Sequence, residues 1–390
     1  MSSRPQIIER LAIAHAERAR DGLLRRVRTV DAVDGAYVRI DGKRVLNFAS
    51  NDYLGLAQHP ALREALVAAA ARWGVGATAA HLLGGHREEH AALEDDLARW
   101  TGRERALLFS DGWMANLGVI AALLGDGDLC VQDKLNHASL VDGARLAGCE
   151  LKRYVHADVA SARRQLESRA DAAALLATND VFSIDDDVAP LRELAALCRE
   201  QGATLMVDDA HGIGVLGPEG AGSVAQAQLA ASDAPILMAT FGKALGVAGA
   251  FVAGSAELID GLVQAARTFI YTTAMPPALA AAVNAAIGIA RFEGWRRDRL
   301  ARLIAHFRAG AKAGGFTLSE SATPIQPLVI GASAATSAIA AKLEDAGFFV
   351  PAIRPPTVPD GKARLRITIT ALHSELDIDR LLAALAKAGA

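Results

Sequence analysis

One lysine stands alone in an apolar stretch of the chain. Lys243 is the only charged residue between Pro235 and Gly254. Burial of an ammonium group is unfavourable, so desolvation lowers the pKa of such a lysine. A neutral lysine amine can form a Schiff base with a carbonyl compound. The alternative is a surface lysine that buries only its apolar stem between two strands.

A second polar group follows a predicted strand over Thr204–Val207. The strand leads into Asp208, Asp209 and His211. Alternation along a strand puts the two carboxylates on opposite faces, so only one of them can reach a shared ligand. A helix cap with surface polar groups is the alternative. Taken with the lysine, a carboxylate for a pyridinium nitrogen and an imidazole predict a pyridoxal phosphate site.

A phosphate group needs backbone donors, and one turn of the chain could supply them. Asp111-Gly112-Trp113 lies between a predicted strand and a predicted helix over Trp113–Leu124. The free N–H groups and the positive end of the helix dipole meet at such a junction. A glycine there more often has a steric reason, so this turn alone is weak support.

A competing motif suggests metal chemistry. The run from His86 to His90 matches the H-x-x-E-H pattern, in which two histidines share one helix face. A zinc hydrolase built on His86, Glu89 and His90 is therefore a remote alternative. The sequence offers no evident third ligand, so two solvated histidines at a helix start are the favoured interpretation, and we predict no metal site.

The elements that position these residues alternate between strands and helices. A helix over Leu191–Glu200, closed by Gly202, is typical of the pattern. It predicts an α/β fold with a mostly parallel central sheet and helices on both faces, in which ligands bind at the carboxyl ends of the strands. The predicted strands are Ala106–Phe109, Leu129–Gln132, Ala172–Ala177, Thr204–Val207, Ile236–Ala239 and Ala250–Ala253.

The two ends of the chain differ from this middle part. An amphipathic helix over Arg4–Arg28 and a hairpin at Asp41-Gly42 form an N-terminal segment, residues 1–50. The large α/β domain is expected over 51–290. A smaller α+β domain over 291–390 is expected to return beside the N-terminal segment. Its predicted elements are a long helix, a strand at Pro327–Ile330, a helix at Ser337–Ala346, a hairpin within Phe348–Thr370 and a helix at Glu375–Ala388.

Composition excludes several classes of protein. Lys and Arg total 41 against 44 Asp and Glu, a net charge of −3, which argues against binding to nucleic acid or anionic membranes. The uncharged stretch Thr268–Ala290 holds Pro276, Pro277 and Asn284, so a buried helix fits better than a membrane span. With three scattered cysteines and no signal-peptide pattern, we expect a cytoplasmic protein.

Five motifs together resemble one known family, the α-oxoamine synthases, which are pyridoxal phosphate enzymes of fold type I. The likeness extends in order from about Arg25 to Leu372. It implies a homodimer with active sites shared between the subunits. The motifs are Asn51–Leu56, Asn136–Ser139, Val207–Gly212, Thr240–Lys243 and Ile270–Thr273.

The resemblance also implies roles at the cofactor. Lys243 would form the internal aldimine, and Asp208 rather than Asp209 would pair with the pyridinium nitrogen. His211, with Ser183, would bond the phenolic oxygen, and His137 would stack on the ring. Lys243, His137, Asp208 and His211 are thus the expected catalytic residues. The phosphate would be held by Gly112 and Trp113 through their backbone, by Thr240, and by Thr272 of the neighbouring subunit.

Substrate roles follow from the same resemblance. Asn51 and Arg354 would orient an amino-acid carboxylate, a task that suits the forked guanidinium group. The run Ala352–Pro359, which includes Thr357 as a further substrate contact, is similar to the members that act in biotin synthesis. Those acyltransferases join L-alanine to a pimeloyl thioester, on coenzyme A or an acyl carrier protein. Arg25 would receive the distal pimeloyl carboxylate, and sister enzymes that use glycine or serine are the alternative.

The chain departs from the family pattern in three places. A Gly/Ser-rich run is replaced by Ala77–Leu83. The usual Thr-Glu-Gly is Thr178-Asn179-Asp180, and a following Asp-Gly-Asp is Asp185-Asp186-Asp187. The last two changes are expected to add acidic groups at the rim of the site.

Overall fold

The computed structural model describes residues 6–184, 187–319 and 322–390, so Asp185 and Asp186 of the acidic run lie outside the described residues. Contacts divide the described chain into two units. Unit 1 takes residues 6–50, 303–319 and 325–390, and unit 2 takes 51–184, 187–302 and 322–324.

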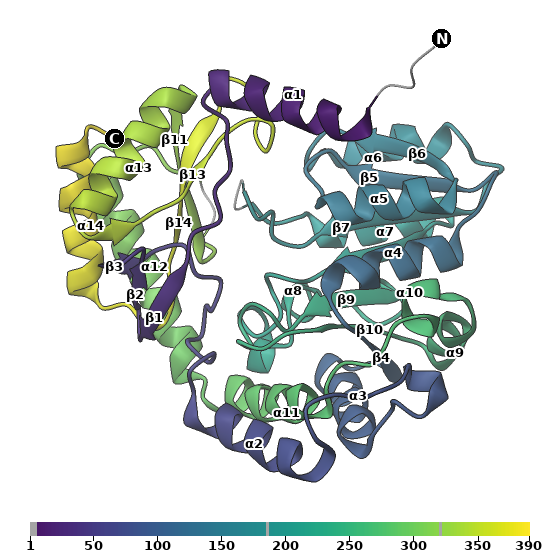
Figure 1. The fold of residues 1–390 in the computed structure, drawn as a ribbon. Coiled ribbons are helices and arrows are strands. Elements are labelled where there is room, and N and C mark those ends of the chain that lie inside the picture. The colour runs from purple at the N-terminus through teal and green to yellow at the C-terminus, as the bar shows by residue number, and fades with distance from the viewer. Residues whose placement is uncertain (1–5, 185–186, 320–321) are drawn as a thin grey trace. The chain divides into compact units, whose positions relative to one another are not determined.

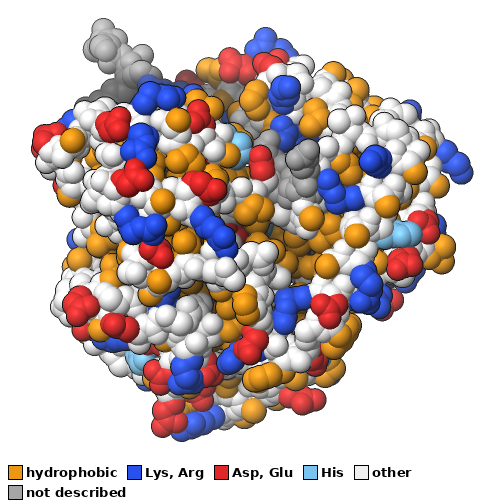
Figure 2. Space-filling view, turned by 180° about the vertical axis from the view of Figure 1, so that it is seen from behind, with side chains coloured by type: hydrophobic (Ala, Val, Ile, Leu, Met, Phe, Trp, Pro, Cys, Tyr) orange, Lys and Arg blue, Asp and Glu red, His pale blue; other side chains and the backbone are white. Residues whose placement is uncertain are grey.

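On the face drawn in Figure 2, Lys and Arg are interspersed with Asp and Glu, as the small net charge leads one to expect.

Unit 2 is built on a seven-stranded sheet within its described residues (Figure 1). Only β10 runs antiparallel to its neighbours, β4 and β9. The pairs formed by β9, β8, β7, β5 and β6 are all parallel, which confirms the predicted mostly parallel sheet. In sheet order the strands are β4 (Arg105–Phe109), β10 (Ala250–Gly254), β9 (Ile236–Thr240), β8 (Thr204–Asp208), β7 (Ala174–Asn179), β5 (Leu129–Asp133) and β6 (Glu150–Tyr154).

Helices cover both faces of this sheet. Strand β8 shows why, since Met206 belongs to one apolar core and Leu205 and Val207 to the other. The first core takes in residues of α4 (Gly112–Leu123), α5 (Ala138–Ala147), α9 (Ala256–Ala265) and α10 (Arg267–Ile270). The second takes in residues of α6 (Val159–Glu167), α7 (Leu191–Gln201) and α8 (Ser223–Gln226).

Local sequence explains where these helices begin and end. Asp111 caps α4 through a bond from the Met114 N–H to its Oδ1, at 2.8 Å. Gly202 ends α7 with a φ of 65°, in the left-handed region that a residue without a Cβ adopts at little cost. The helix therefore stops where the sequence predicts it to stop.

The remaining elements of unit 2 frame the sheet. Helix α11 (Pro277–Phe292) packs against α2 (Pro60–Trp73) and α3 (Glu88–Thr101). Two short 3-10 helices complete the unit, η1 (His81–Leu83) and η2 (Pro218–Gly220). Among the described residues, no helix is long and apolar enough to cross a membrane.

Unit 1 contains two small sheets. One has the order β1 (Val30–Asp34), β2 (Tyr37–Ile40), β3 (Lys43–Asn47) and β12 (Phe348–Phe349). The other has the order β11 (Ile325–Gly331), β14 (Ala363–Thr368) and β13 (Ala352–Ile353). The prediction of one hairpin within Phe348–Thr370 was wrong in part. Only β13 pairs with β14, whereas β12 pairs in parallel with β3 from the N-terminal segment.

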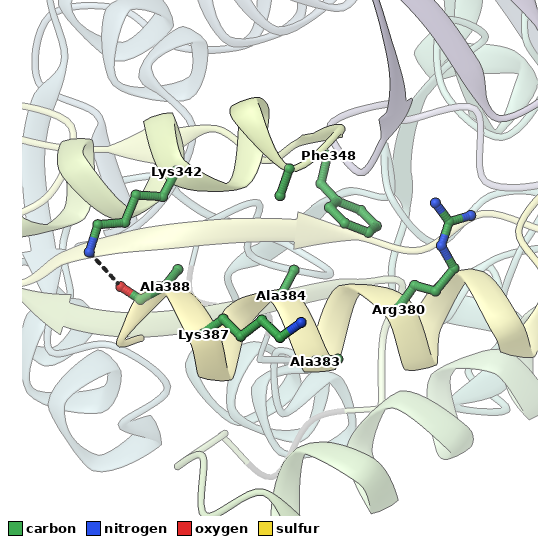
Figure 3. A pocket seen from close by; sticks show the side chains of 8 residues that line it. Lys342, Phe348, Arg380, Ala383, Ala384, Lys387 and Ala388 are labelled. Carbon is green, nitrogen blue, oxygen red and sulfur yellow. Dashed lines mark hydrogen bonds between the residues drawn. The ribbon is translucent and has the colours of Figure 1, made fainter.

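The helices of unit 1 are α1 (Ile7–Arg20), α13 (Ser333–Asp345) and α14 (Glu375–Ala388), and α12 (Trp295–Ala313) carries residues of both units. The predicted helix over Arg4–Arg28 is shorter, since α1 ends at Arg20. Lys342 of α13 donates to the carbonyl of Ala388, beside a groove that α13 and α14 line (Figure 3). Lys387 and Arg380 of α14 also lie along this groove.

Candidate active site

A cavity lies at the carboxyl ends of β7, β8 and β9, where a parallel sheet is expected to bind ligands. It brings together residues that are more than 130 positions apart in the chain. Asn116, Ser139, Asn179, Ala210 and Met238 also line it. The predicted cofactor residues found on its wall are Gly112, Trp113, His137, Ser183, Asp208, His211, Thr240 and Lys243.

Asp208 is the last residue of β8 and is almost fully buried. Its Oδ2 accepts a hydrogen bond of 2.8 Å from the Asn116 side chain, and its Oδ1 accepts one of 3.2 Å from the Ala210 N–H. The same Asn116 amide donates to the Ser139 hydroxyl at 2.9 Å. Two donors from different elements therefore fix the orientation of this carboxylate.

His137 caps the N-terminus of α5 at the wall of the cavity. Its Nδ1 lies 2.7 Å from the Ser139 Oγ, and its backbone N–H donates to the Asn179 side chain at 2.7 Å. The ring of Trp113 meets it edge to face, with centres 5.6 Å apart. Burial lowers the pKa of His137, although the charge of Asp208 acts in the opposite direction. A neutral, oriented imidazole results.

A buried tyrosine connects His211 to Asn51. The His211 Nδ1 and the Tyr53 hydroxyl oxygen are 2.7 Å apart. The same hydroxyl lies 3.4 Å from the Asn51 Oδ1, which is a longer contact. Tyr53 is fully buried, so its ring holds this chain of polar groups in place from the apolar side.

The start of α4 and the end of β9 form one part of the cavity wall. Gly112 and Trp113 are the first two residues of α4, and their N–H groups have no partner within the helix. A Cβ at Gly112 would lie 3.8 Å from the Thr240 Cβ, in the space between these elements. The Thr240 hydroxyl is oriented by a bond to the Gly249 carbonyl at 2.9 Å. This geometry suits a phosphate.

Asp209 faces away from the cavity. Both of its carboxylate oxygens accept the Ser223 N–H, at 3.1 and 2.9 Å. A Cβ on Gly212 would lie 2.2 Å from the Asp209 Oδ1 and 2.4 Å from the Asp180 Oδ2, so the two carboxyl groups meet at this glycine. Both are fully buried. Burial raises the pKa of Asp180 strongly and that of Asp209 to about 6. The charge of Asp209 raises the pKa of Asp180 further, whereas a hydrogen bond with Asp180 lowers the pKa of Asp209.

A second pair of carboxylates, Asp133 and Asp187, differs because the His156 imidazole lies between them. The His156 ring nitrogens lie 2.9 Å from an oxygen of Asp133 and 2.9 Å from an oxygen of Asp187. Burial lowers the pKa of His156, but these two carboxylates outweigh it and raise the value to about 10. The acidic residue Asp187 at the rim is thus matched by a positive charge.

Five predicted residues lie outside the cavity wall, and one of them is Asn51, which is connected to it through Tyr53 and His211. The Thr272 hydroxyl of this chain lies 4.0 Å from the Met114 sulfur. Arg25, Arg354 and Thr357 belong to unit 1. There, Arg354 donates to the Gly22 carbonyl at 2.7 Å, three residues before Arg25, and the Thr357 N–H donates to the Arg354 carbonyl at 3.1 Å. Their substrate roles stay predictions.

Sequence reasoning missed Asn116 and assigned no role to Tyr53 and Ser139. Asn116 carried a usable signal, because it is the only amide side chain in the apolar segment Gly112–Leu123. A buried amide needs hydrogen-bond partners, just as a buried lysine needs its charge removed or paired. Tyr53 and Ser139 lie in ordinary polar settings of the sequence, and only the fold brings them to the site.

The competing zinc motif is only partly supported. His86 and His90 lie close together, with ring centres 5.4 Å apart. The Glu89 Oε1, however, lies 3.6 Å from a nitrogen of Arg72. The expectation of two solvated histidines was wrong, because His90 is fully buried and packs against a third histidine, His81.

The cavity fits pyridoxal phosphate by the chemistry of its groups. When bound, this cofactor supplies an aldehyde and a pyridine ring that withdraws electrons from an attached amino acid. The wall offers the amine of Lys243, the carboxylate of Asp208 and the N-terminus of α4. The buried Asn116 Oδ1 also has no hydrogen-bond partner among the described residues, so an acceptor remains for a bound group.

Comparisons with known proteins agree with this fit. The class I and II aminotransferase family matches residues 43–385. The 8-amino-7-oxononanoate synthase of Halorhodospira halophila is 55% identical, over 97% of this chain and 94% of its own. That of Xanthomonas axonopodis pv. citri is 51% identical, over 99% and 96%.

Solved structures support the same fold and cofactor. A structure of SPT, a serine palmitoyltransferase, with a PLP internal aldimine superposes with a TM-score of 0.94. It is 28% identical in sequence and the match covers 99% of this chain and 98% of that one. The fold is thus that of the fold type I enzymes, which use pyridoxal phosphate. By sequence and by structure, the chain belongs to the 8-amino-7-oxononanoate synthase family within the class I and II aminotransferases.

Proposed function

We propose that this enzyme joins L-alanine to a pimeloyl thioester with the help of pyridoxal phosphate. The products are 8-amino-7-oxononanoate, carbon dioxide and a free thiol, and the pathway served is biotin synthesis. The observation that carries the proposal is the meeting of Lys243, Asp208, His137 and His211 in one cavity. The relatives that share 51–55% of the sequence bear the name of this activity.

The reaction makes one carbon–carbon bond and breaks the carbon–sulfur bond of the thioester and the bond between the alanine Cα and its carboxylate. The Cα of alanine bonds to the thioester carbonyl carbon, the thiolate leaves, and the alanine carboxylate is lost as carbon dioxide. Bound pyridoxal phosphate supplies the electron sink that stabilises negative charge at Cα. The chain must therefore hold the cofactor, remove the Cα proton and return a proton at the end.

Lys243 is the proposed anchor and proton carrier. Its amine would hold the cofactor, and the same amine is the base at the Cα proton of alanine. Asp208 would keep a proton on the ring nitrogen, because a buried carboxylate favours a cationic partner. The neutral imidazole of His137 would cover one face of the ring, and His211 with Ser183 would bond the phenolic oxygen.

Substrate recognition is proposed for Asn51, Arg354, Thr357 and Arg25. Asn51 is connected to the cavity through Tyr53 and His211. Arg354, with Thr357, would bind the alanine carboxylate, and Arg25 would bind the far carboxylate of the pimeloyl chain. The contact of Arg354 with the Gly22 carbonyl supports a joint site, since it brings these two arginines into one part of unit 1.

We further propose a cytoplasmic homodimer in which Thr272 serves the cofactor of the neighbouring subunit. Thr272 does not line the cavity of its own chain among the described residues. The adjacent Tyr271 is 72% exposed, although large aromatic side chains are usually covered. The three cysteines carry free thiols, which suits a reducing compartment.

The anchor is tested with Lys243→Ala. Purified wild-type enzyme should be yellow, and borohydride reduction followed by peptide mapping should place the adduct on Lys243. The variant should lose the absorption band and the activity. Lys362→Ala, an exposed lysine of unit 1, is the matched control and should keep both. An adduct on another lysine would overturn the assignment.

The substrate is tested by thiol release from pimeloyl-coenzyme A and from a pimeloyl-acyl carrier protein. Each donor is combined with alanine, glycine or serine. Release should be fastest with alanine, and the better donor identifies the carrier. A preference for glycine or serine would instead place the chain among the sister enzymes.

A further inference from the structure

We propose that His81, His86 and His90 form a binding site for a divalent transition-metal ion such as zinc, apart from the cofactor cavity. His81 begins η1, His86 lies in the loop that follows, and His90 is in the first turn of α3. None of the three lines the cofactor cavity in the described part of the chain. The sequence motif supplied two of these ligands, and the fold supplies the third.

The three rings have the spacing of a tetrahedral site. Each can offer one ring nitrogen so that all three nitrogens lie within 4.8 Å of one another. The ring centres are 5.2, 5.1 and 5.4 Å apart. Zinc binds imidazole nitrogen at about 2.0–2.1 Å, so a ring centre lies about 3.2 Å from the ion and two tetrahedral ligands lie about 5.2 Å apart. The observed triangle matches this value.

The Nδ1 atoms of His81 and His86 are already close, at 2.9 Å. With Nδ1 as the ligand, the Nε2 of His86 remains to face the Glu94 carboxylate, 3.8 Å away. The Nε2 of His90 donates to the Met275 carbonyl at 2.8 Å. Carboxylates and carbonyls in these positions orient metal-binding imidazoles and fix their tautomers.

Packing holds the third ring. His81 stacks on Phe269, with ring centres 5.0 Å apart and an angle of 18° between the planes. His81 and His90 are buried, whereas the His86 side chain is 34% exposed. Two ligands are thus rigid, and the exposed one gives an ion access to the site.

Metal binding requires two existing hydrogen bonds to open, and the first is the one between the Nδ1 atoms of His81 and His86. The Nδ1 of His90 accepts the Arg87 N–H at 2.8 Å. The second is this bond, whose release leaves one amide at the start of α3, where Arg87 is only partly buried and water can replace the imidazole. The loss of two neutral hydrogen bonds is small beside the gain of three metal–nitrogen bonds.

The electrostatics favour a cation over a proton. Burial lowers the pKa of all three histidines, that of His81 to about 3, so the imidazoles are neutral at pH 7 and ready to bind. Burial also raises the pKa of Glu94 to about 7. Glu89 and Arg87 act on His90 in opposite directions.

The site would join two segments that are far apart in sequence. Ala80 bridges Thr273, and the Ala274 N–H donates to the Ala79 carbonyl at 3.0 Å. Met275, the partner of His90, lies in the same segment. A bound ion would therefore stiffen the stretch that directly follows Thr272. Three imidazoles suit zinc, copper or nickel better than magnesium or calcium.

The test uses untagged holoenzyme treated with a chelator and then titrated with cobalt(II), whose visible spectrum reports tetrahedral coordination. We expect one ion per chain, a tetrahedral spectrum, displacement by zinc and a rise in Tm with zinc. His86→Gln should weaken cobalt binding at least tenfold and abolish the rise in Tm. Because His86 is partly exposed, this variant should fold and retain its basal activity.

His306→Gln is the matched control, since His306 is a partly exposed histidine of unit 1 that bonds Asp379. It should bind cobalt as the wild type does. The proposal is overturned if chelated enzyme takes up no stoichiometric cobalt, if the spectrum is that of the aqueous ion, or if His86→Gln and His306→Gln bind equally well.

Discussion

Asp208 and Asp209 are neighbours in sequence but lie in opposite settings. Asp208 lines the cavity with Lys243 and receives N–H donors from Asn116 and Ala210. Asp209 turns to the other side of the same strand end, where it meets Asp180 at Gly212. The first carboxylate is oriented towards the cavity by two donors, and the second is buried beside another carboxyl group, where burial raises the pKa of both. The face of the strand, rather than the residue type, decides the role.

The largest expected effect tests the cavity side of this comparison. Asp208→Asn should lower kcat by about 100-fold or more, because a charge-assisted hydrogen bond to the reacting system is worth about 3 kcal/mol. Steady-state kinetics at saturating cofactor measure this loss. Asp209→Asn is the control and should change kcat by less than about tenfold. If Asp209→Asn is the more damaging change, the assignment of the two faces is wrong.

The next effect concerns the support of Asp208. Asn116→Ala removes the donor to Asp208 and to Ser139, and should lower kcat by about tenfold, the equivalent of one lost hydrogen bond of about 1.4 kcal/mol. The absorption band of the bound cofactor should remain, since Lys243 is intact. Unchanged kinetics would show that Asp208 needs no such support.

The buried pair of Asp180 and Asp209 is tested through the free energy of unfolding. The raised pKa values of Asp180 and Asp209 mean that their contribution is fully present below the unfolded value, 3.8, and is lost as pH rises through the folded values. Asp180→Asn mimics the protonated acid and cannot ionise. The variant should therefore gain free energy of unfolding relative to the wild type, and the gain should grow from pH 4 upward.

Urea unfolding at a series of pH values, with constant cofactor, measures this gain. Asp171→Asn is a suitable control, because Asp171 is exposed and Arg169 lowers its pKa. It should show no gain that grows with pH. A flat difference between wild type and Asp180→Asn would mean that the two buried acids share no proton.

The smallest effect is expected for Asp133 and Asp187, the two carboxylates on either side of His156. His156→Asn should lower the free energy of unfolding by about 1 kcal/mol at pH 6, because it removes a cation between Asp133 and Asp187. The pKa of His156 is raised to about 10, so its contribution is present below pH 6.5 and is lost as pH rises towards 10. The variant and the wild type should converge at that pH in the same unfolding measurements.

Strands were predictable where the chain itself carries the pattern. The predicted strand at Ile236–Ala239 corresponds to β9, Ile236–Thr240, because a buried parallel strand is apolar on both faces. Strand β6, Glu150–Tyr154, was missed because it lies at the sheet edge and is mostly polar. The pairing of β12 with β3 joins segments 300 residues apart, and no local pattern specifies such a partner.

The site was predictable to the extent that polar residues interrupt apolar runs. Lys243 and Asp208 stand out in this way, and the cavity contains both. Tyr53 and His81 do not stand out, because each becomes important only when the fold brings a distant partner to it. For Tyr53 that partner is His211, 158 positions away. Tertiary contact, not composition, makes these residues significant.

Gly212 lies where packing alone forbids a side chain. Carboxyl oxygens of Asp180 and Asp209 occupy the space that any side chain on this residue would need. Replacement by alanine would force the turn after Asp208 to shift, although Gly212 has no side chain and does not line the cavity in the described part of the chain. A scan of substitutions would therefore find Gly212 as intolerant of change as a catalytic residue. The cause would be crowding by two neighbouring carboxyl groups.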